Sequence, residues 1–115
     1  MDDLKLWLDD VRPAPEGYIW CKSVNEAKNA IIETEEKNKS SYMFNCFFSI
    51  ELLDLDHDAG DYAKNGGDYI RLLNWLEETS RNYPIHIHSM NPVGVENMRA
   101  IIQRNGWKEI KIKTI

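Results

Sequence analysis

The sequence predicts a single α/β domain with a mostly parallel sheet, and three observations lead to this prediction. Short apolar runs alternate along the chain with segments of helical periodicity. Polar, titratable residues follow directly after three of these runs, Leu4–Leu8, Ile50–Leu53 and Ile85–Ile87. The length of 115 residues suits one domain, residues 1–115, with one core. Because open α/β sheets bind ligands at the C-terminal ends of their strands, we expect one acidic cleft there.

The first part of the chain predicts two strands joined by a loop. Leu4–Leu8 forms a short strand and Tyr18–Cys21 forms another. Between them, Pro13 and Pro15 exclude a regular helix and favour an extended segment. A doubly wound fold usually has its first helix at this point, so we expect a proline-rich loop in place of that helix.

A helix and the central strand follow. Ser23 and Glu26 have the spacing of a capping box, which predicts a helix that starts at Ser23 and ends near residues 38–41. Its buried face consists of small and apolar residues, Val24, Ala27, Ala30 and Ile31. Tyr42–Phe48 fits either an extension of the next strand or an irregular lead-in. Ile50–Leu55 is the clearest strand of the chain.

The next segment predicts a loop, a helix and a strand. Asp61–Gly67 is rich in turn residues, and a helix begins near Asp68 and stops at 82–84, where a proline follows. The apolar face of this helix is formed by Tyr69, Leu72, Leu73 and Leu76. Ile85–His88 is then the fourth strand.

The end of the chain predicts one more helix and strand. Pro92 suits the first turn of a helix, and Gly106 suits the position just after its end. The inner face of this helix is formed by Val95, Met98, Ile101 and Ile102. Lys108–Ile115 alternates and predicts a lysine-guarded edge strand. The resulting order implies right-handed crossovers, about five strands and helices on both faces, which is a three-layer sandwich.

The composition excludes several classes of protein. The net charge of −5 argues against a broad nucleic-acid-binding surface, although it allows a nucleotide or an RNA end held through a metal. Cys21 and Cys46 have no metal-binding spacing, so we expect two reduced, buried thiols. No apolar run approaches the ~20 residues that cross a bilayer, and the N-terminus lacks the features of a signal peptide. We therefore expect a cytoplasmic protein that does not bind membranes; the sequence gives no oligomeric state.

Acidic residues concentrate at two of the strand ends. Asp9 and Asp10 follow the first strand, and Asp56 and Asp58 follow Asp54 at spacings that favour one face. Like charges in one cleft do not all ionise without a cation, and clusters of carboxylate oxygens suit Mg²⁺ or a similar ion. The alternative is that some of these acids cap helices or lie in solvent.

The histidines lie beside these acids. His57 stands between two aspartates and fits a general acid or base, a metal ligand or the filler of a tight turn. His86 and His88 share one face of a strand, and His88 is next to the strand end, so it is the better functional candidate. We expect His86 to pack.

Three further residues predict a phosphate site. Ser89 and Asn91 precede the helix at Pro92, and donors beside a helix N-terminus favour anions. Asn91 also fits a simple N-cap. Arg12 fits a bidentate phosphate ligand or a partner that neutralises Asp9 or Asp10. No Walker loop, dinucleotide fingerprint or nucleophile elbow is present.

Three motifs in order resemble the cyclic-phosphate-processing receiver-like domain family: LWLDDVRPAP, LDHDAG and HSMNPVGVENM, at Leu6–Pro15, Leu55–Gly60 and His88–Met98. The resemblance covers nearly the whole chain. It implies a receiver-like (flavodoxin-like) fold and a role in handling cyclic phosphates at RNA ends or in nucleotides.

The resemblance to receivers also implies roles for single residues. Asp9 and Asp10 match the metal-binding acid pair of receivers, Asp56 matches the phosphoacceptor, and Ser89 resembles the hydroxyl residue after the fourth strand. Lys113 is a weak counterpart of the receiver lysine. His57, Asp58, His88 and Asn91 are additions to the receiver pattern, and they favour a hydrolytic or ligand-binding site over signalling.

The leading hypothesis is therefore an enzyme, a metal-dependent phosphohydrolase acting on a cyclic phosphate in a small molecule or at an RNA end. Its predicted roles are metal ligands Asp9, Asp10 and Asp56 for Mg²⁺ or Mn²⁺, catalytic His57, His88 and Asp58, and phosphate-binding Arg12, Ser89 and Asn91. The alternatives are a non-catalytic phosphate- or metal-binding module and a signalling domain phosphorylated on Asp56.

Overall fold

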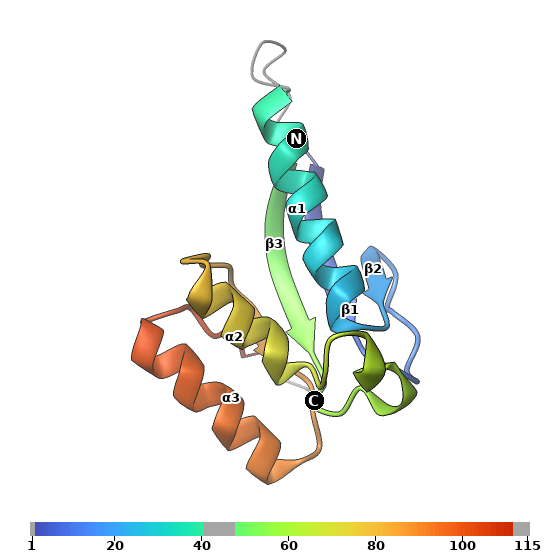
Figure 1. Cartoon of the computed structure of the whole chain (residues 1–115), viewed down its shortest axis with the longest axis vertical. Coiled ribbons are helices and arrows are strands. Elements are labelled where there is room, and N and C mark those ends of the chain that lie inside the picture. The colour runs from blue at the N-terminus through green and yellow to red at the C-terminus, as the bar shows by residue number, and fades with distance from the viewer. Residues whose placement is uncertain (1, 41–47, 112–115) are drawn as a thin grey trace.

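A parallel four-stranded sheet forms the centre of the protein, as seen in a computed structural model that describes residues 2–40 and 48–111 (Figure 1). The strands are β1 (Asp2–Leu8), β2 (Tyr18–Cys21), β3 (Phe48–Leu55) and β4 (Ile85–Ile87). Their order in the sheet is β2-β1-β3-β4, and each neighbouring pair is parallel. The α/β class and the parallel sheet predicted from the sequence are thus confirmed.

The helices are α1 (Val24–Ser40), α2 (Ile70–Glu78) and α3 (Pro92–Asn105). Helix α1 lies along β1 and β3, and α2 and α3 pack side by side (Figure 1). The prediction of a plain loop at Asp61–Gly67 is wrong, because Gly60–Asn65 forms a 3-10 helix, η2. Turn-rich residues allow this short helix because its bonds span only three residues.

The core lies between the helices and one face of the sheet. Alternate residues of the two central strands, Leu6, Leu8, Leu53 and Leu55, are fully buried in one cluster with apolar residues of all three helices. Burying each such leucine stabilises the fold by about 1.5–3 kcal/mol. Because this alternation fixes the register of β3, it also fixes where the acids that follow Leu55 lie.

The opposite face of the sheet carries different side chains. Trp7 and Tyr18 lie outside the core cluster, in edge-to-face contact with ring centroids 5.8 Å apart. The ammonium of Lys5 lies 5.4 Å from the centre of the Tyr18 ring. The helices that follow β2, β3 and β4 all join the one core cluster, so the predicted helical layer over this second face is not found among the described residues.

The helix ends follow local chemistry. Ser23 Oγ accepts a hydrogen bond from the N–H of Glu26 at 3.1 Å, which confirms Ser23 as the cap of α1. The carboxylate of Glu26 accepts from the N–H of Lys22, not from that of Ser23, so the predicted capping box is displaced by one residue. Pro92 begins α3, and Gly106 ends it with a left-handed φ of 68°.

The described residues test several of the sequence predictions only in part. Residues 9–17, between β1 and β2, contain no helix, while the idea that they replace a first helix stays a prediction. Glu109 forms one parallel bridge with Ile85, and residues 112–115 of the predicted fifth strand, Lys113 included, lie outside the described part. The same holds for Cys46 and for residues 42–47. Cys21 is a buried free thiol, as expected.

Candidate metal and phosphate site

Asp9 anchors the site at the C-terminal end of β1. Its Oδ1 accepts hydrogen bonds from the backbone N–H groups of Val11 and Arg12, at 2.9 and 2.8 Å. Burial alone would raise the pKa of this carboxyl, but the backbone donors, the His88 contact and the Arg12 charge together lower the pKa below its ordinary value. Asp9 is therefore a carboxylate at neutral pH.

Arg12 joins two acids that are far apart in the sequence. Its Nε lies 3.1 Å from Asp9 Oδ2, and its Nη2 lies 3.3 Å from Asp56 Oδ2. The carbonyl oxygen of Arg12 accepts a hydrogen bond from the indole N–H of Trp7 at 2.9 Å. The backbone of this residue is therefore held, while its side chain is 49% exposed.

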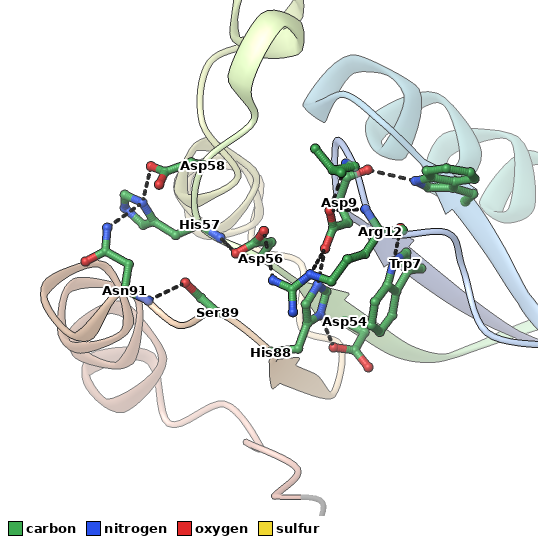
Figure 2. A network of polar contacts seen from close by, with 12 residues as sticks. Trp7, Asp9, Arg12, Asp54, Asp56, His57, Asp58, His88, Ser89 and Asn91 are labelled. Carbon is green, nitrogen blue, oxygen red and sulfur yellow. Dashed lines mark hydrogen bonds and ion pairs between the residues drawn. The ribbon is translucent and has the colours of Figure 1, made fainter.

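His88 follows β4 and contacts acids with both ring nitrogens. Nε2 lies 3.0 Å from Asp9 Oδ2, and Nδ1 lies 2.7 Å from Asp54 Oδ1. His86 Nδ1 lies 2.8 Å from the same oxygen of Asp54. The indole of Trp7 stacks on the His88 ring with centroids 3.8 Å apart and planes 2° apart. Figure 2 shows this network, in which His88 lies between Asp9 and Asp54.

Asp9, Asp56 and His88 form a group that fits a metal ion. Each offers one ligand atom, and these atoms lie within 4.8 Å of one another. Two carboxylates and an imidazole match the oxygen preference of Mg²⁺ only in part, whereas Mn²⁺ accepts both ligand types. Among the described residues, no other group of three or more histidines, cysteines and acids has its ligand atoms this close together.

Asp10 is not a member of that group. A Cβ atom added at Gly60 would come within 2.3 Å of Asp10 Oδ2, so the carboxylate of Asp10 packs against the backbone of the loop after β3. Gly60 has a φ of 55°, which a larger residue would adopt only with strain. The metal role predicted for Asp10 stays a prediction.

His57 and Asp58 form a second pair beside the group. His57 Nδ1 lies 2.8 Å from Asp58 Oδ1, and the backbone N–H of His57 donates to Asp56 Oδ1 at 2.7 Å. Figure 2 shows the His57 ring turned toward Asn91 at the start of α3 and away from Asp9. This ring lies so close to Gly94 that an added Cβ would be 2.4 Å from it.

Ser89 and Asn91 shape the start of α3. Asn91 Oδ1 accepts from the N–H of Gly94 at 3.1 Å, so the N-cap role considered for Asn91 is present. Its Nδ2 lies 3.5 Å from His57 Nδ1. Ser89 Oγ accepts from the N–H of Asn91 at 3.1 Å. Both side chains thus face the same end of the sheet as His57 (Figure 2).

Comparison with known families decides which group of proteins this is. The family model described as "Cyclic-phosphate processing Receiver domain" matches residues 4–104. The chain belongs to this family. No curated protein and no solved structure matches it.

Membership of the cyclic-phosphate processing receiver family gives the fold and the acidic site a common context. The protein is a receiver-like α/β domain, and receiver domains bind a divalent metal at an acidic pocket such as the one that contains Asp9 and Asp56. Among residues 2–40 and 48–111, no helix combines the length and apolar character needed to cross a bilayer.

Three members of the site network were not predicted from the sequence as site residues: Trp7, Asp54 and His86. The sequence places Trp7 in the apolar run that predicts the first strand, and it predicts that His86 packs in the protein without a role in the site. The sequence groups Asp54 with Asp56 and Asp58 by spacing without giving it a role, and the matching spacing of His86 and His88 on the neighbouring strand is the signal that indicates one.

Proposed function

We propose that the protein is a metal-dependent phosphohydrolase that opens a cyclic phosphate, in a nucleotide or at an RNA end. The observation that carries this proposal is the meeting of Asp9, Asp56 and His88 beside the half-exposed guanidinium of Arg12. A cyclic phosphate is an anion, and metal ions and arginines are common ligands of such anions.

Asp9, Asp56 and His88 would hold the ion, which supplies Lewis-acid polarisation of a phosphoryl oxygen when bound. Arg12 binds a second phosphate oxygen, because its Nε and Nη2 form the planar fork that matches such a group. Ser89 and Asn91, beside the N-terminus of α3, orient the phosphate through their side chains and through the positive end of the helix.

His57 moves the proton. With Nδ1–H donated to Asp58, Nε2 carries the lone pair and takes a proton from the attacking water. The water oxygen forms a new bond to phosphorus, and the bond from phosphorus to one ribose oxygen breaks. That oxygen then receives the proton from His57, which leaves a phosphate monoester and a free hydroxyl group. Asp58 holds the tautomer and stabilises the imidazolium formed in between.

The test is turnover of 2′,3′-cyclic nucleotides by the purified protein with Mg²⁺ or Mn²⁺. We expect product with the wild type, loss of product with Asp56→Asn, and a strong reduction with His57→Gln. Arg104→Ala, which alters an ion pair with Glu77 elsewhere, is the matched control and retains activity. A wild-type protein that is inert with both metals on cyclic and linear phosphate esters contradicts the proposal.

A second candidate is a domain that accepts a phosphoryl group on Asp56, which matches the receiver acceptor. Its Oδ2 contacts the half-exposed Arg12, and the Asp56 side chain is itself 16% exposed, which supports this alternative. Incubation with a small phosphodonor followed by intact-mass measurement separates the two: an adduct that Asp56→Asn abolishes favours phosphorylation. Saturable phosphate binding with neither adduct nor product would favour a binding module.

A further inference from the structure

Asp54 is a buried acid that the proposed reaction does not use. It lies on β3 between Leu53 and Leu55 and is 1% exposed. Burying a carboxylate costs free energy unless hydrogen bonds and charges compensate it. Since the inner strands of parallel sheets are mostly apolar, an aliphatic residue would fit here without that cost.

The partners of Asp54 come from the neighbouring strand end. The sheet register pairs Asp54 with His86, and His88 lies two residues further along on the same side. Both histidines place Nδ1 against Oδ1 of Asp54, at 2.8 and 2.7 Å. An ionised carboxylate only accepts hydrogen bonds, so His88 donates to it through Nδ1–H.

Contacts also fix the Nε2 atom and one face of the His88 ring. Its Nε2 faces Asp9 Oδ2 at 3.0 Å, within the group that fits a metal. The Trp7 indole covers one ring face in a parallel stack, and the bond from its own N–H to the Arg12 carbonyl fixes the indole. A flip of the imidazole would therefore break both acid contacts.

We propose that Asp54 and Trp7 are positioning residues that hold His88 with Nδ1–H toward Asp54 and Nε2 toward Asp9 and Asp56. The metal part of this inference rests on the proposed function, whereas the ring orientation does not. A carboxylate behind a ligating histidine fixes its tautomer and increases the basicity of the nitrogen that faces the metal. This role explains why an acid occupies a buried position in β3.

The test uses Asp54→Asn, which preserves size and removes the charge. In wild-type protein without metal, we expect a downfield His88 Nδ1–H proton resonance that is protected from solvent exchange. In Asp54→Asn this resonance shifts strongly or disappears, and Mn²⁺ binding measured by calorimetry weakens by about 10- to 100-fold. The resonance is assigned by its loss in His88→Gln, and far-UV circular dichroism checks the fold.

The matched control is His86→Gln, which removes the other partner of the same oxygen and leaves the His88 contact in place. We expect it to retain the resonance and to bind Mn²⁺ within a few-fold of wild type. If Asp54→Asn does not fold, Trp7→Leu tests the same idea, because loss of the stack should broaden the resonance and weaken Mn²⁺ binding while Asp54 remains.

The outcomes separate this inference from the proposed function. A wild-type protein without the protected resonance, or an Asp54→Asn protein that binds Mn²⁺ as tightly as wild type, overturns the positioning role. A resonance and an affinity that respond as expected, in a protein that turns over no cyclic phosphate, support the positioning role and contradict only the hydrolase. If wild type binds no Mn²⁺, the metal part fails and the resonance alone decides the orientation.

Discussion

Arg12 Nη2 lies 3.3 Å from Asp56 Oδ2, so the loop after β1 is tied to the acid that follows β3. The same guanidinium contacts Asp9 through Nε at 3.1 Å. One cation thus lies against two of the three residues that fit a metal ion. Because the Arg12 backbone is held and its side chain is half-exposed, a metal that binds these carboxylates would release the guanidinium toward a phosphate.

The first prediction follows from this competition. Arg12→Ala should bind Mn²⁺ more tightly than wild type, because the metal no longer displaces a cation from Asp9 and Asp56. Ion pairs of a solvent-accessible side chain contribute about 0.2–1 kcal/mol, so the gain in affinity should be about 1.4- to fivefold. The same variant should bind inorganic phosphate more weakly in the presence of the metal. Calorimetric titrations with each ligand measure both effects.

Arg104→Ala serves as the control, since its partner Glu77 is on α2, away from the site. Both affinities should stay at their wild-type values in this variant. An Arg12→Ala protein that binds Mn²⁺ more weakly would show that Arg12 supports the metal group and does not compete with the ion.

The second prediction concerns the close approach of His57 to Gly94. An alanine in a helix is usually more stable than a glycine, by about 0.5–1 kcal/mol. Here the added Cβ would lie 2.4 Å from the His57 ring, so Gly94→Ala should destabilise the protein and displace the ring. In a His57→Ala background the same change should be neutral or stabilising. Denaturant unfolding of the four proteins gives the coupling free energy between the two positions.

A coupling near zero would show that His57 moves aside without cost. For the proposed hydrolase, Gly94→Ala should in that case turn over cyclic phosphate as wild type does, whereas a held ring predicts a loss close to that of His57→Ala. Measuring the coupling free energy and the turnover on the same variants distinguishes displacement of the His57 ring from general destabilisation.

Much of the fold could be predicted because it depends on local patterns. The apolar runs located β1, β2, β3 and β4, and Pro92 and Gly106 located the ends of α3. The strand ends also located Asp9, Asp56 and His88, since parallel strands bring their C-terminal ends to one edge. These predictions needed no knowledge of which side chains meet.

The features that could not be predicted from the sequence depend mostly on contacts between segments far apart in the chain. Asp54 is buried because Trp7 and His86 flank it from other strands; spacing along the chain gives the face on which Asp54 lies but not these partners. The close approach of Gly94 to His57 could not be predicted, because only the path of the chain brings the two residues together. The loop predicted at Asp61–Gly67 overlaps the 3-10 helix Gly60–Asn65, since turn-rich sequence also allows such a short helix.

The third prediction concerns pH and the ion pair between α1 and the segment after α2. Arg81 contacts Glu35 in bidentate fashion, with Nε and Nη2 at 3.0 and 2.8 Å from its oxygens. The Arg81 hydrogen bonds, opposed by burial and aided by Tyr83, lower the pKa of Glu35 below its ordinary value of 4.5. A lowered folded pKa gives stability that is fully present above pH 4.5 and is lost as the pH falls through the folded value.

The free energy of unfolding of wild type should therefore fall between about pH 5 and pH 3 by more than that of Glu35→Gln. At pH 7, Glu35→Gln should be less stable than wild type by about 1–3 kcal/mol, because Arg81 loses a charged acceptor. Glu33→Gln, exposed on the same helix, is the control and should follow the wild-type curve. Parallel curves for wild type and Glu35→Gln would contradict the prediction.

The last prediction decides the role of Asp10. Asp56→Asn removes a charged ligand from the metal group, and such contacts are worth about 1.5–3 kcal/mol, so Mn²⁺ affinity should fall by about 10- to 100-fold. Asp10 lies outside the group and packs against Gly60, so Asp10→Asn should weaken binding by only about threefold, through the loss of a screened charge. Gly60→Ala, which displaces the Asp10 carboxylate, should have a similarly small effect. Equal losses in Asp10→Asn and Asp56→Asn would instead make Asp10 a ligand, as the acid pair after β1 predicts, and would require this carboxylate to turn away from Gly60 when the ion binds.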